Sequence, residues 1–386
     1  NAARLCKTVY DKPARGMPVV ADLGLYLTIQ EMQEHFKGCV YIQDLHRVMI
    51  PDGRMMKAEQ FNAAYGGHMF QMSPDGTKPT DEAFKALTQN KAFKFPQAIS
   101  PCFRPEMPPH AIDAEGSINV YVPPKVTMTE GDVTPFMTLL AKLLPVERDR
   151  AILLAYMASC VQNPGVKFQW APVLQGCEGN GKTAIFSAVL YAIGRRYTHQ
   201  PKAKHLGGQF NKYLENKLFI LVEEIHMQGR REMLDDLKPL ITNLEIEVEG
   251  KGVDQRMADN RANWAFCTNY KDAVLKSRGD RRYAIFFTAQ QAPEDLARDG
   301  MTGSFFPNFW TWLRGDGYAH VAWFLKHYHI PADLDPAGLC HRAPETSSTN
   351  VAIEESRGGF EHDILDAAAS NVAGFRGGWV SSHALT

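Results

Sequence analysis

Apolar positions in the middle of the chain repeat at helical spacing and predict a pair of helices. The first helix is expected from Thr134, a good N-cap residue followed by Pro135, which suits a first helical turn. Its apolar stripe consists of Phe136, Leu139, Leu140, Leu143 and Leu144. The run 147–162 predicts a second helix, which ends at Asn163–Gly165. Residues 126–165 are therefore expected to form a helical hairpin.

Short apolar runs then alternate with a helical pattern, which indicates a layered α/β domain. A helix is expected over 182–193, and strands are expected over 170–174, 218–222, 262–267 and 283–287. Strands that alternate with helices usually form parallel sheets. We therefore predict a core with a mainly parallel sheet over residues 166–290.

The segments on either side of this core have weaker patterns. Residues 1–125 are rich in Pro and Gly and predict a small α+β domain followed by a connector. Residues 291–342 predict a helical extension with many aromatic residues. Aromatic side chains at helical spacing usually pack in a core, so we favour that interpretation over a base-stacking surface. Residues 343–386 predict a linker and the start of a further domain.

One motif in the core has a well-defined chemistry. The sequence of 176–183 is GCEGNGKT, the pattern of a phosphate-binding loop between a strand and a helix. In such a loop the glycines turn backbone amides toward phosphates, Lys182 reaches the β- and γ-phosphates, and Thr183 binds Mg²⁺. We predict that ATP and Mg²⁺ are bound through Gly176, Gly179, Asn180, Gly181, Lys182, Thr183 and Ala184.

Polar residues at the ends of two further strands would complete a hydrolytic site. Glu223 and Glu224 follow the strand over 218–222. We expect Glu223 to hold the Mg²⁺ shell and Glu224 to polarise the attacking water. Asn269 follows another apolar strand and would orient that water beside the γ-phosphate.

Basic residues suggest contacts with a neighbouring subunit and with DNA. Arg281 and Arg282 precede the last strand, and one of them is a candidate arginine finger, with Arg282 favoured because it lies nearer the strand. The segment 245–256 predicts a hairpin with Lys251 at its tip. Lys251 and Arg256 are candidate contacts to DNA phosphates. The alternatives are a solvated loop for the arginines and a plain exposed turn for Lys251.

The order of these features resembles that of superfamily 3 helicases, the AAA+ motors of small viruses, phages and plasmids. Over residues 100–290 the chain is similar to the helicase part of phage and plasmid primase–helicases, especially at 238–243, 250–255 and 259–263. The resemblance implies an AAA+ P-loop ATPase core and a ring, usually a hexamer, with ATP between subunits. It also implies hairpins that grip single-stranded DNA in a central channel.

Relatives of this kind often carry a primase–polymerase domain upstream. Residues 1–125 contain no Asp-x-Asp pair suited to primer synthesis, so we expect such a domain or partner outside this chain. The chain begins at Asn1 rather than Met, and we expect it to be a piece of a longer protein or a processed chain.

The leading hypothesis is an ATP-dependent DNA helicase that acts on single-stranded or forked DNA in replication of a phage or mobile element. The alternative is a P-loop ATPase that acts as a nucleotide switch or assembly factor without translocating. A P-loop kinase of small molecules is a third hypothesis, but it explains neither the acid pair nor the arginines.

Composition limits the partners and the compartment. The net charge is -1, so contact with a nucleic acid must come from a local basic patch. The seven cysteines are odd in number and lack metal-site spacing, which favours a reducing compartment. The longest apolar runs are too short to cross a bilayer. We therefore expect a cytoplasmic protein, in the host cell if a phage encodes it, without membrane contact.

Overall fold

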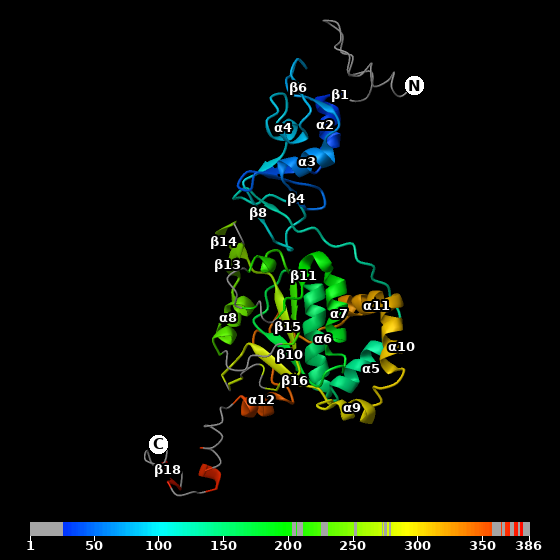
Figure 1. Ribbon diagram of the computed structural model, residues 1–386, viewed down its shortest axis with the longest axis vertical. Helices are drawn as coiled ribbons and strands as arrows, with labels where there is room; N and C mark the ends of the chain where they lie inside the picture. The colour runs from blue at the N-terminus through cyan, green and yellow to red at the C-terminus, as the bar shows by residue number, and fades with distance from the viewer. Residues whose placement is uncertain are drawn as a thin grey trace. The chain divides into compact units, whose positions relative to one another are not determined.

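The computed structural model divides the chain into two compact units, Asn1–Pro123 and Pro124–Thr386 (Figure 1). The residues that it describes are 26–202, 206, 211–224, 231–250, 253–271, 273, 276–277, 279–356, 364, 367–370, 374–376 and 379–380. Among these residues, no helix combines the length and the apolar character needed to cross a membrane.

The first unit contains short strands and helices around an aromatic core. Its larger sheet has the order β4 (Met55–Met56), β3 (Arg47–Met49), β2 (Val40–Ile42), β7 (Gln97–Ala98). Its smaller sheets are β1 (Tyr26–Leu27), β5 (Met69–Gln71), β6 (Pro79–Thr80) and the pair β8 (Ser100–Cys102), β9 (Ser117–Asn119). The helices are α2 (Ile29–His35), α3 (Ala58–Tyr65) and α4 (Ala83–Thr88). Phe36, Phe61 and Phe70 are buried between these elements and form the centre of the core.

The second unit is built on a five-stranded sheet in which all neighbouring strands are parallel. The order is β11 (Thr198–His199), β12 (Phe219–Val222), β15 (Asn263–Thr268), β10 (Ala171–Gln175), β16 (Tyr283–Phe287). Every residue of β10, β12 and β15 is buried, as expected for a parallel sheet covered on both faces. The sheet is therefore parallel, as the sequence predicts, and its strands end at one common edge.

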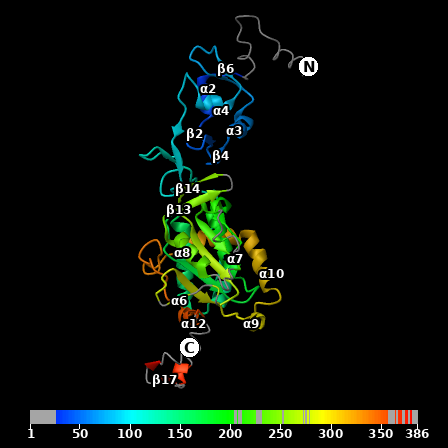
Figure 2. The ribbon, with the colours of Figure 1, turned by 60° about the vertical axis from the view of Figure 1, so that its left-hand side comes forward.

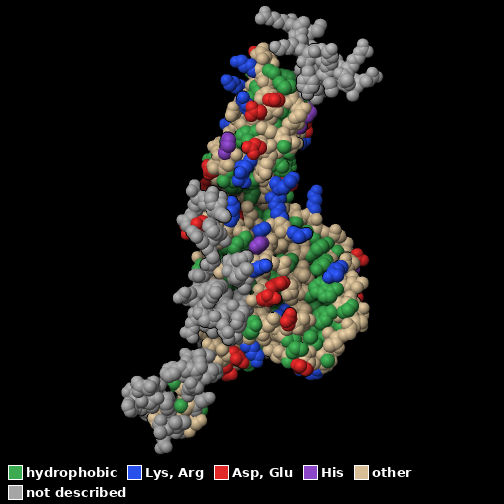
Figure 3. Space-filling view, in the orientation of Figure 1, with side chains coloured by type: hydrophobic (Ala, Val, Ile, Leu, Met, Phe, Trp, Pro, Cys, Tyr) green, Lys and Arg blue, Asp and Glu red, His purple; other side chains and the backbone are tan. Residues whose placement is uncertain are grey.

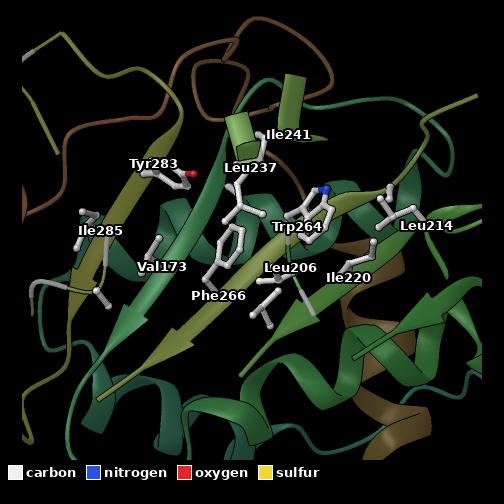
Figure 4. Close-up of a cluster of buried hydrophobic side chains, with 14 of the residues drawn as sticks. Val173, Leu206, Leu214, Ile220, Leu237, Ile241, Trp264, Phe266, Tyr283 and Ile285 are labelled. Carbon is white, nitrogen blue, oxygen red and sulfur yellow. The ribbon is translucent and has the colours of Figure 1, made fainter. Parts of the chain in front are cut away.

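Helices cover both faces of this sheet. One face carries α7 (Lys182–Ile193), which packs on β12 and β15 and contacts α5 (Thr134–Leu143) and α6 (Glu147–Gln162). The other face carries α8 (Arg231–Thr242), whose Leu237 and Ile241 pack with Trp264 and Phe266 of β15 (Figure 4). The remaining elements are η2 (Arg195–Tyr197), η4 (Lys212–Leu214), α9 (Pro293–Arg298), α10 (Phe305–Trp312), the π-helical η5 (Leu313–Gly317), α11 (Tyr318–His327), α12 (Thr349–Glu355), β17 (Phe375–Arg376) and β18 (Trp379–Val380).

The predicted N-cap of the first helix is wrong by one residue. Thr134 is the first residue of α5, and Val133 occupies the cap position. The Asp132 Oδ1 atom accepts a hydrogen bond of 2.8 Å from the Thr134 backbone N–H. Because Asp132 satisfies this first free amide, the helix does not need the Thr134 side chain as a cap.

The hairpin of β13 (Glu245–Gly250) and β14 (Val253–Asp259) lies beside α8 (Figures 1 and 2). Buried Asn260, directly after β14, donates from Nδ2 to the carbonyls of Leu240 at 2.9 Å and Asn243 at 2.8 Å. The Nζ atom of buried Lys167 donates to the same Leu240 carbonyl at 2.8 Å, and burial lowers the pKa of Lys167 well below its usual value. These bonds connect the base of the hairpin, which we call its root, at Asn260, to the C-terminal end of α8.

We predict that Asn260→Ala destabilises the second unit. The change removes the Asn260 donor from the Asn243 carbonyl and one of the donors of the Leu240 carbonyl, and a buried unsatisfied group costs about 1–3 kcal/mol. Urea-induced unfolding should show a free energy of unfolding lower by about 2 kcal/mol or more. The matched control is Asn243→Ala, because the Asn243 side chain is exposed and its loss should change stability by less than about 0.5 kcal/mol. Equal effects of the two substitutions would contradict this account of the root.

Candidate functional site

The segment 176–183 leaves the carboxyl end of β10 and leads into α7. Gly179 and Gly181 have φ angles of 78° and 93°, in the left-handed region that glycine adopts without strain. A Cβ atom on Gly176 would lie 1.9 Å from the Oγ1 atom of Thr288, so no larger residue fits there. The three glycines therefore have the backbone freedom and close packing that a phosphate-binding loop requires.

The Lys182 ammonium is folded into this loop and is surrounded by oxygen atoms. The residue is only 6% exposed, and burial lowers the pKa of Lys182. Its Nζ atom donates to four oxygens, the carbonyls of Gly176 at 2.8 Å and Cys177 at 2.7 Å and the Oδ1 atoms of Asn180 at 3.1 Å and Asn269 at 3.0 Å. None of the four is a carboxylate, so the positive charge is solvated but not neutralised. Such a cation can exchange a neutral oxygen for an anionic one.

Two asparagines fix the surroundings of Lys182. The Asn180 Nδ2 atom donates at 2.9 Å to the Thr288 hydroxyl, which follows β16. Asn269, predicted to lie near the γ-phosphate, follows β15 and makes direct contact with the lysine. The structure therefore places Asn269 next to the loop, although the two are 87 residues apart in the sequence.

Glu223 and Glu224 follow β12 at the same edge of the sheet. Glu223 is half-buried, and its Oε1 atom accepts a hydrogen bond of 3.3 Å from Gln200 Nε2. Glu224 is exposed and has a φ angle of 53°, a left-handed conformation that is uncommon outside glycine. Strained backbone of this kind often occurs at functional positions.

The predicted loop residues from Gly179 to Ala184, the two acids and Asn269 line one cavity of about 450 Å³. Its lining comprises residues 178–184, Glu223, Glu224, residues 267–269, Phe306 and Trp310. Burial raises the pKa of the Cys267 thiol to about 12, so this thiol is neutral at physiological pH. The cavity therefore combines the loop cation with the two carboxylates that follow β12 and the amide that follows β15.

The sequence interpretation missed Phe306 and Trp310, which come from α10 and were expected to pack in a core. Phe309 of the same helix is buried as expected. The spacing of four residues places Phe306 and Trp310 on a common side of the helix, and both are half-buried. The guanidinium carbon of Arg314 lies 5.5 Å from the centre of the Trp310 ring. Only the four-residue spacing was readable in advance, and it does not reveal that this side of α10 faces the loop.

Several side-chain oxygens in the cavity are suitable ligands for a hard cation such as Mg²⁺. Thr183 supplies a hydroxyl, and Glu223 and Glu224 supply carboxylates. In the part of the chain that the structure describes, no group of three or more His, Cys, Asp and Glu side chains could hold a metal alone. This donor set fits Mg²⁺, which is usually bound through one or two protein oxygens together with substrate phosphates.

The structure does not bring Arg281 and Arg282 into this cavity. Arg282 directly precedes β16, and its carbonyl accepts a hydrogen bond from Ala171 N, the first residue of β10, at 2.8 Å. The arginines are therefore at the amino end of the parallel strands, whereas the loop leaves the carboxyl end. Arg281 is exposed, but Arg282 is half-buried, and its buried Nε atom has no hydrogen-bond partner among the described residues. Arg282 was favoured as the arginine finger because it lies next to the strand, but the same position restricts the movement of its side chain.

The predicted DNA contacts are only partly described. Lys251 lies outside the described residues, and Arg256 belongs to β14 but its side chain also lies outside them. On β13, Ile246 is buried while Glu245 and Glu247 are exposed. The described flank of this strand therefore carries negative charge.

Part of the chain matches the sequence model of a protein family, and its fold is similar to that of known structures. Residues 174–282 match a family of unknown function, DUF5906. No curated protein shows significant similarity to the chain. The apo structure of the NrS-1 C-terminal region (305–718) has a TM-score of 0.65 at 16% identity and covers 86% of this chain and 75% of its own. The A-form apo structure of the same region has a TM-score of 0.64 at 14% identity, with coverages of 87% and 76%. The chain thus shares the mixed α/β fold of the NrS-1 C-terminal region.

Proposed function

We propose that this chain is an ATP-dependent DNA helicase, a ring-forming AAA+ motor of the superfamily 3 type. The observation that carries the proposal is the single cavity in which Lys182, Glu224 and Asn269 meet. A cation that binds phosphates and polar groups that position the attacking water are among the parts that hydrolysis of a nucleoside triphosphate uses. We further infer a role in phage or mobile-element replication, a cytoplasmic location and an upstream primase–polymerase domain or partner.

Binding of ATP would begin with an exchange at Lys182. The ammonium leaves the carbonyls of Gly176 and Cys177 and binds the β- and γ-phosphates, whose full charges attract it more strongly than neutral oxygens do. The amides of the loop and of the first turn of α7 donate to the same phosphates. Mg²⁺, held by Thr183 and Glu223, would neutralise phosphate charge.

Hydrolysis would then depend on Glu224 and Asn269. Glu224 is exposed, so water reaches its carboxylate without a change of fold. The carboxylate accepts a proton from the attacking water, and the Asn269 amide fixes the direction of attack. Asn269 is well placed for this task because β15 lies between the loop strand and the acid strand.

The position of the arginines supports a shared site. The cavity lining within the described residues contains no arginine. Because Arg281 and Arg282 lie at the other end of the strands, an arginine finger would have to come from a second copy of the chain. This arrangement favours a homo-oligomer, and the proposal is a hexameric ring with Lys251 and Arg256 facing single-stranded or forked DNA.

The acidic flank of the hairpin favours the alternative function. Glu245 and Glu247 are exposed and would repel a DNA backbone. A nucleotide switch or assembly ATPase would use the same cavity without gripping DNA. The two functions differ in whether hydrolysis is coupled to strand separation.

We predict that the protein hydrolyses ATP and unwinds forked DNA, and that Lys182→Ala abolishes both activities. The substitution removes the cation that binds the phosphates, and phosphate release and strand separation are the measurements. The matched control is Lys326→Ala, because Lys326 is exposed on α11 and does not line the cavity. Hydrolysis without unwinding would favour the switch, whereas wild-type hydrolysis by Lys182→Ala would end the ATPase proposal.

We also predict that Trp310→Ala weakens ATP binding by about tenfold, because loss of an aromatic–base contact costs about 1–3 kcal/mol. Binding of inorganic tripolyphosphate should be unchanged, since this probe has no base. Equilibrium binding of both compounds gives the comparison. Trp312→Ala is the control, because Trp312 is also half-buried on α10 but does not line the cavity. Equal losses for ATP and tripolyphosphate would show that Trp310 supports the loop rather than the base.

A further inference from the structure

A second cavity, of about 610 Å³, lies within the first unit and has no part in the site described above. Its wall is formed by the turn over 72–80, by Lys85 of α4 and by Lys91. Met72, Pro74 and Pro79 supply apolar surface to this wall. We call it the lysine cavity, because Lys78, Lys85 and Lys91 all line it.

The lysine cavity carries an excess of positive charge. Its three lysines are exposed, and none of them takes part in an ion pair within 4.0 Å among the described residues. The only acidic residue of the lining is Asp75. The Asp75 carboxylate accepts hydrogen bonds from the Ser73 hydroxyl and from the Thr77 hydroxyl and backbone N–H, and these bonds lower the pKa of Asp75. Asp75 therefore closes its own turn instead of pairing with a lysine.

Hydrogen bonds hold the wall of this cavity in place. The Lys91 backbone N–H donates to the Met72 carbonyl at 3.0 Å, and Asn90 Nδ2 donates to the Gln71 carbonyl at 2.7 Å. On the other side of the turn, the Tyr26 hydroxyl donates to the Gly76 carbonyl at 3.4 Å. The segment after α4 is thus tied to the start of the turn, so the lysines are gathered by the fold of the unit.

The positive charge is local. Residues 1–123 contain thirteen Lys and Arg and thirteen Asp and Glu, so the unit as a whole is not basic. Figure 3 nevertheless shows Lys and Arg side chains gathered at the part of this unit that contains β6 and α4. Because the unit carries no net charge, its attraction for an anionic ligand is concentrated at this site.

We propose that the lysine cavity binds the sugar–phosphate backbone of a single-stranded nucleic acid. Lysine ammonium groups neutralise phosphates, and the apolar wall of Met72, Pro74 and Pro79 offers a surface to sugars and bases. A flexible single strand can place a nucleotide inside a recessed cavity, whereas the stacked bases of a duplex stay inside the helix. The proposal does not depend on the ATPase site, and it gives the first unit the task of holding a strand.

The test compares two double variants of the whole chain. Lys78→Ala/Lys85→Ala removes two cations of the cavity, and Lys37→Ala/Lys57→Ala removes two exposed lysines of the same unit that do not line it. Binding of a labelled oligothymidylate is measured by fluorescence anisotropy over a range of chloride concentrations, without nucleotide. Each lost phosphate contact reduces the slope of the logarithm of the binding constant against the logarithm of the salt concentration by about 0.7. The slope for the first variant should therefore be smaller in magnitude by about 1.4. This corresponds to an affinity about 25-fold weaker at 0.1 M salt.

Several outcomes would overturn the proposal. One is an equal slope and affinity for both double variants, and another is an equal loss of binding to a duplex of the same length. A third is displacement of the oligonucleotide by inorganic phosphate at an ionic strength matched with chloride, because the cavity would then take free phosphate. Phosphate release in the absence of DNA should be unchanged in both variants. Failure of this inference is therefore distinct from failure of the ATPase proposal.

Discussion

The hydrogen bond between Lys182 and Asn269 is the contact on which the candidate site depends. It joins the phosphate-binding loop to the end of β15 at 3.0 Å. The order of the sheet makes this contact possible, because β15 lies between β10, which leads into the loop, and β12, which leads into the two acids. Parallel strands end at a common edge, so three segments far apart in the sequence meet around one lysine.

Burial of the sheet keeps this edge rigid. Tyr156 of α6 donates from its hydroxyl to the Trp264 carbonyl at 2.7 Å, which ties a helix directly to β15. On the opposite face, the side chains of α8 pack on the same strand (Figure 4). Movement of β15 would disrupt both layers. Asn269 is therefore held on a fixed support, while Glu224 is exposed to solvent on a strained turn. A rigid amide and an accessible base suit the two tasks proposed for them.

The sequence predicts the parts of this account that depend on local patterns. The helix over 182–193 and the strand over 283–287 have the predicted bounds, because apolar periodicity and the glycine-rich loop determine them locally. The wall formed by Phe306 and Trp310 was missed, because a helix at residues 305–312 packs near a loop more than a hundred residues earlier. The lysine cavity was also missed, since Lys78, Lys85 and Lys91 look like separate solvated charges until the turn brings them together.

The most direct test of the central claim is the steady-state kinetics of Asn269→Ala. If Asn269 orients the attacking water beside a lysine-bound phosphate, kcat for ATP hydrolysis should fall by about 100-fold. Binding of ATP should change little, because the loop amides and Lys182 remain. A kcat equal to that of the wild type would contradict the account, since the contact between β15 and the loop would then have no part in the chemistry.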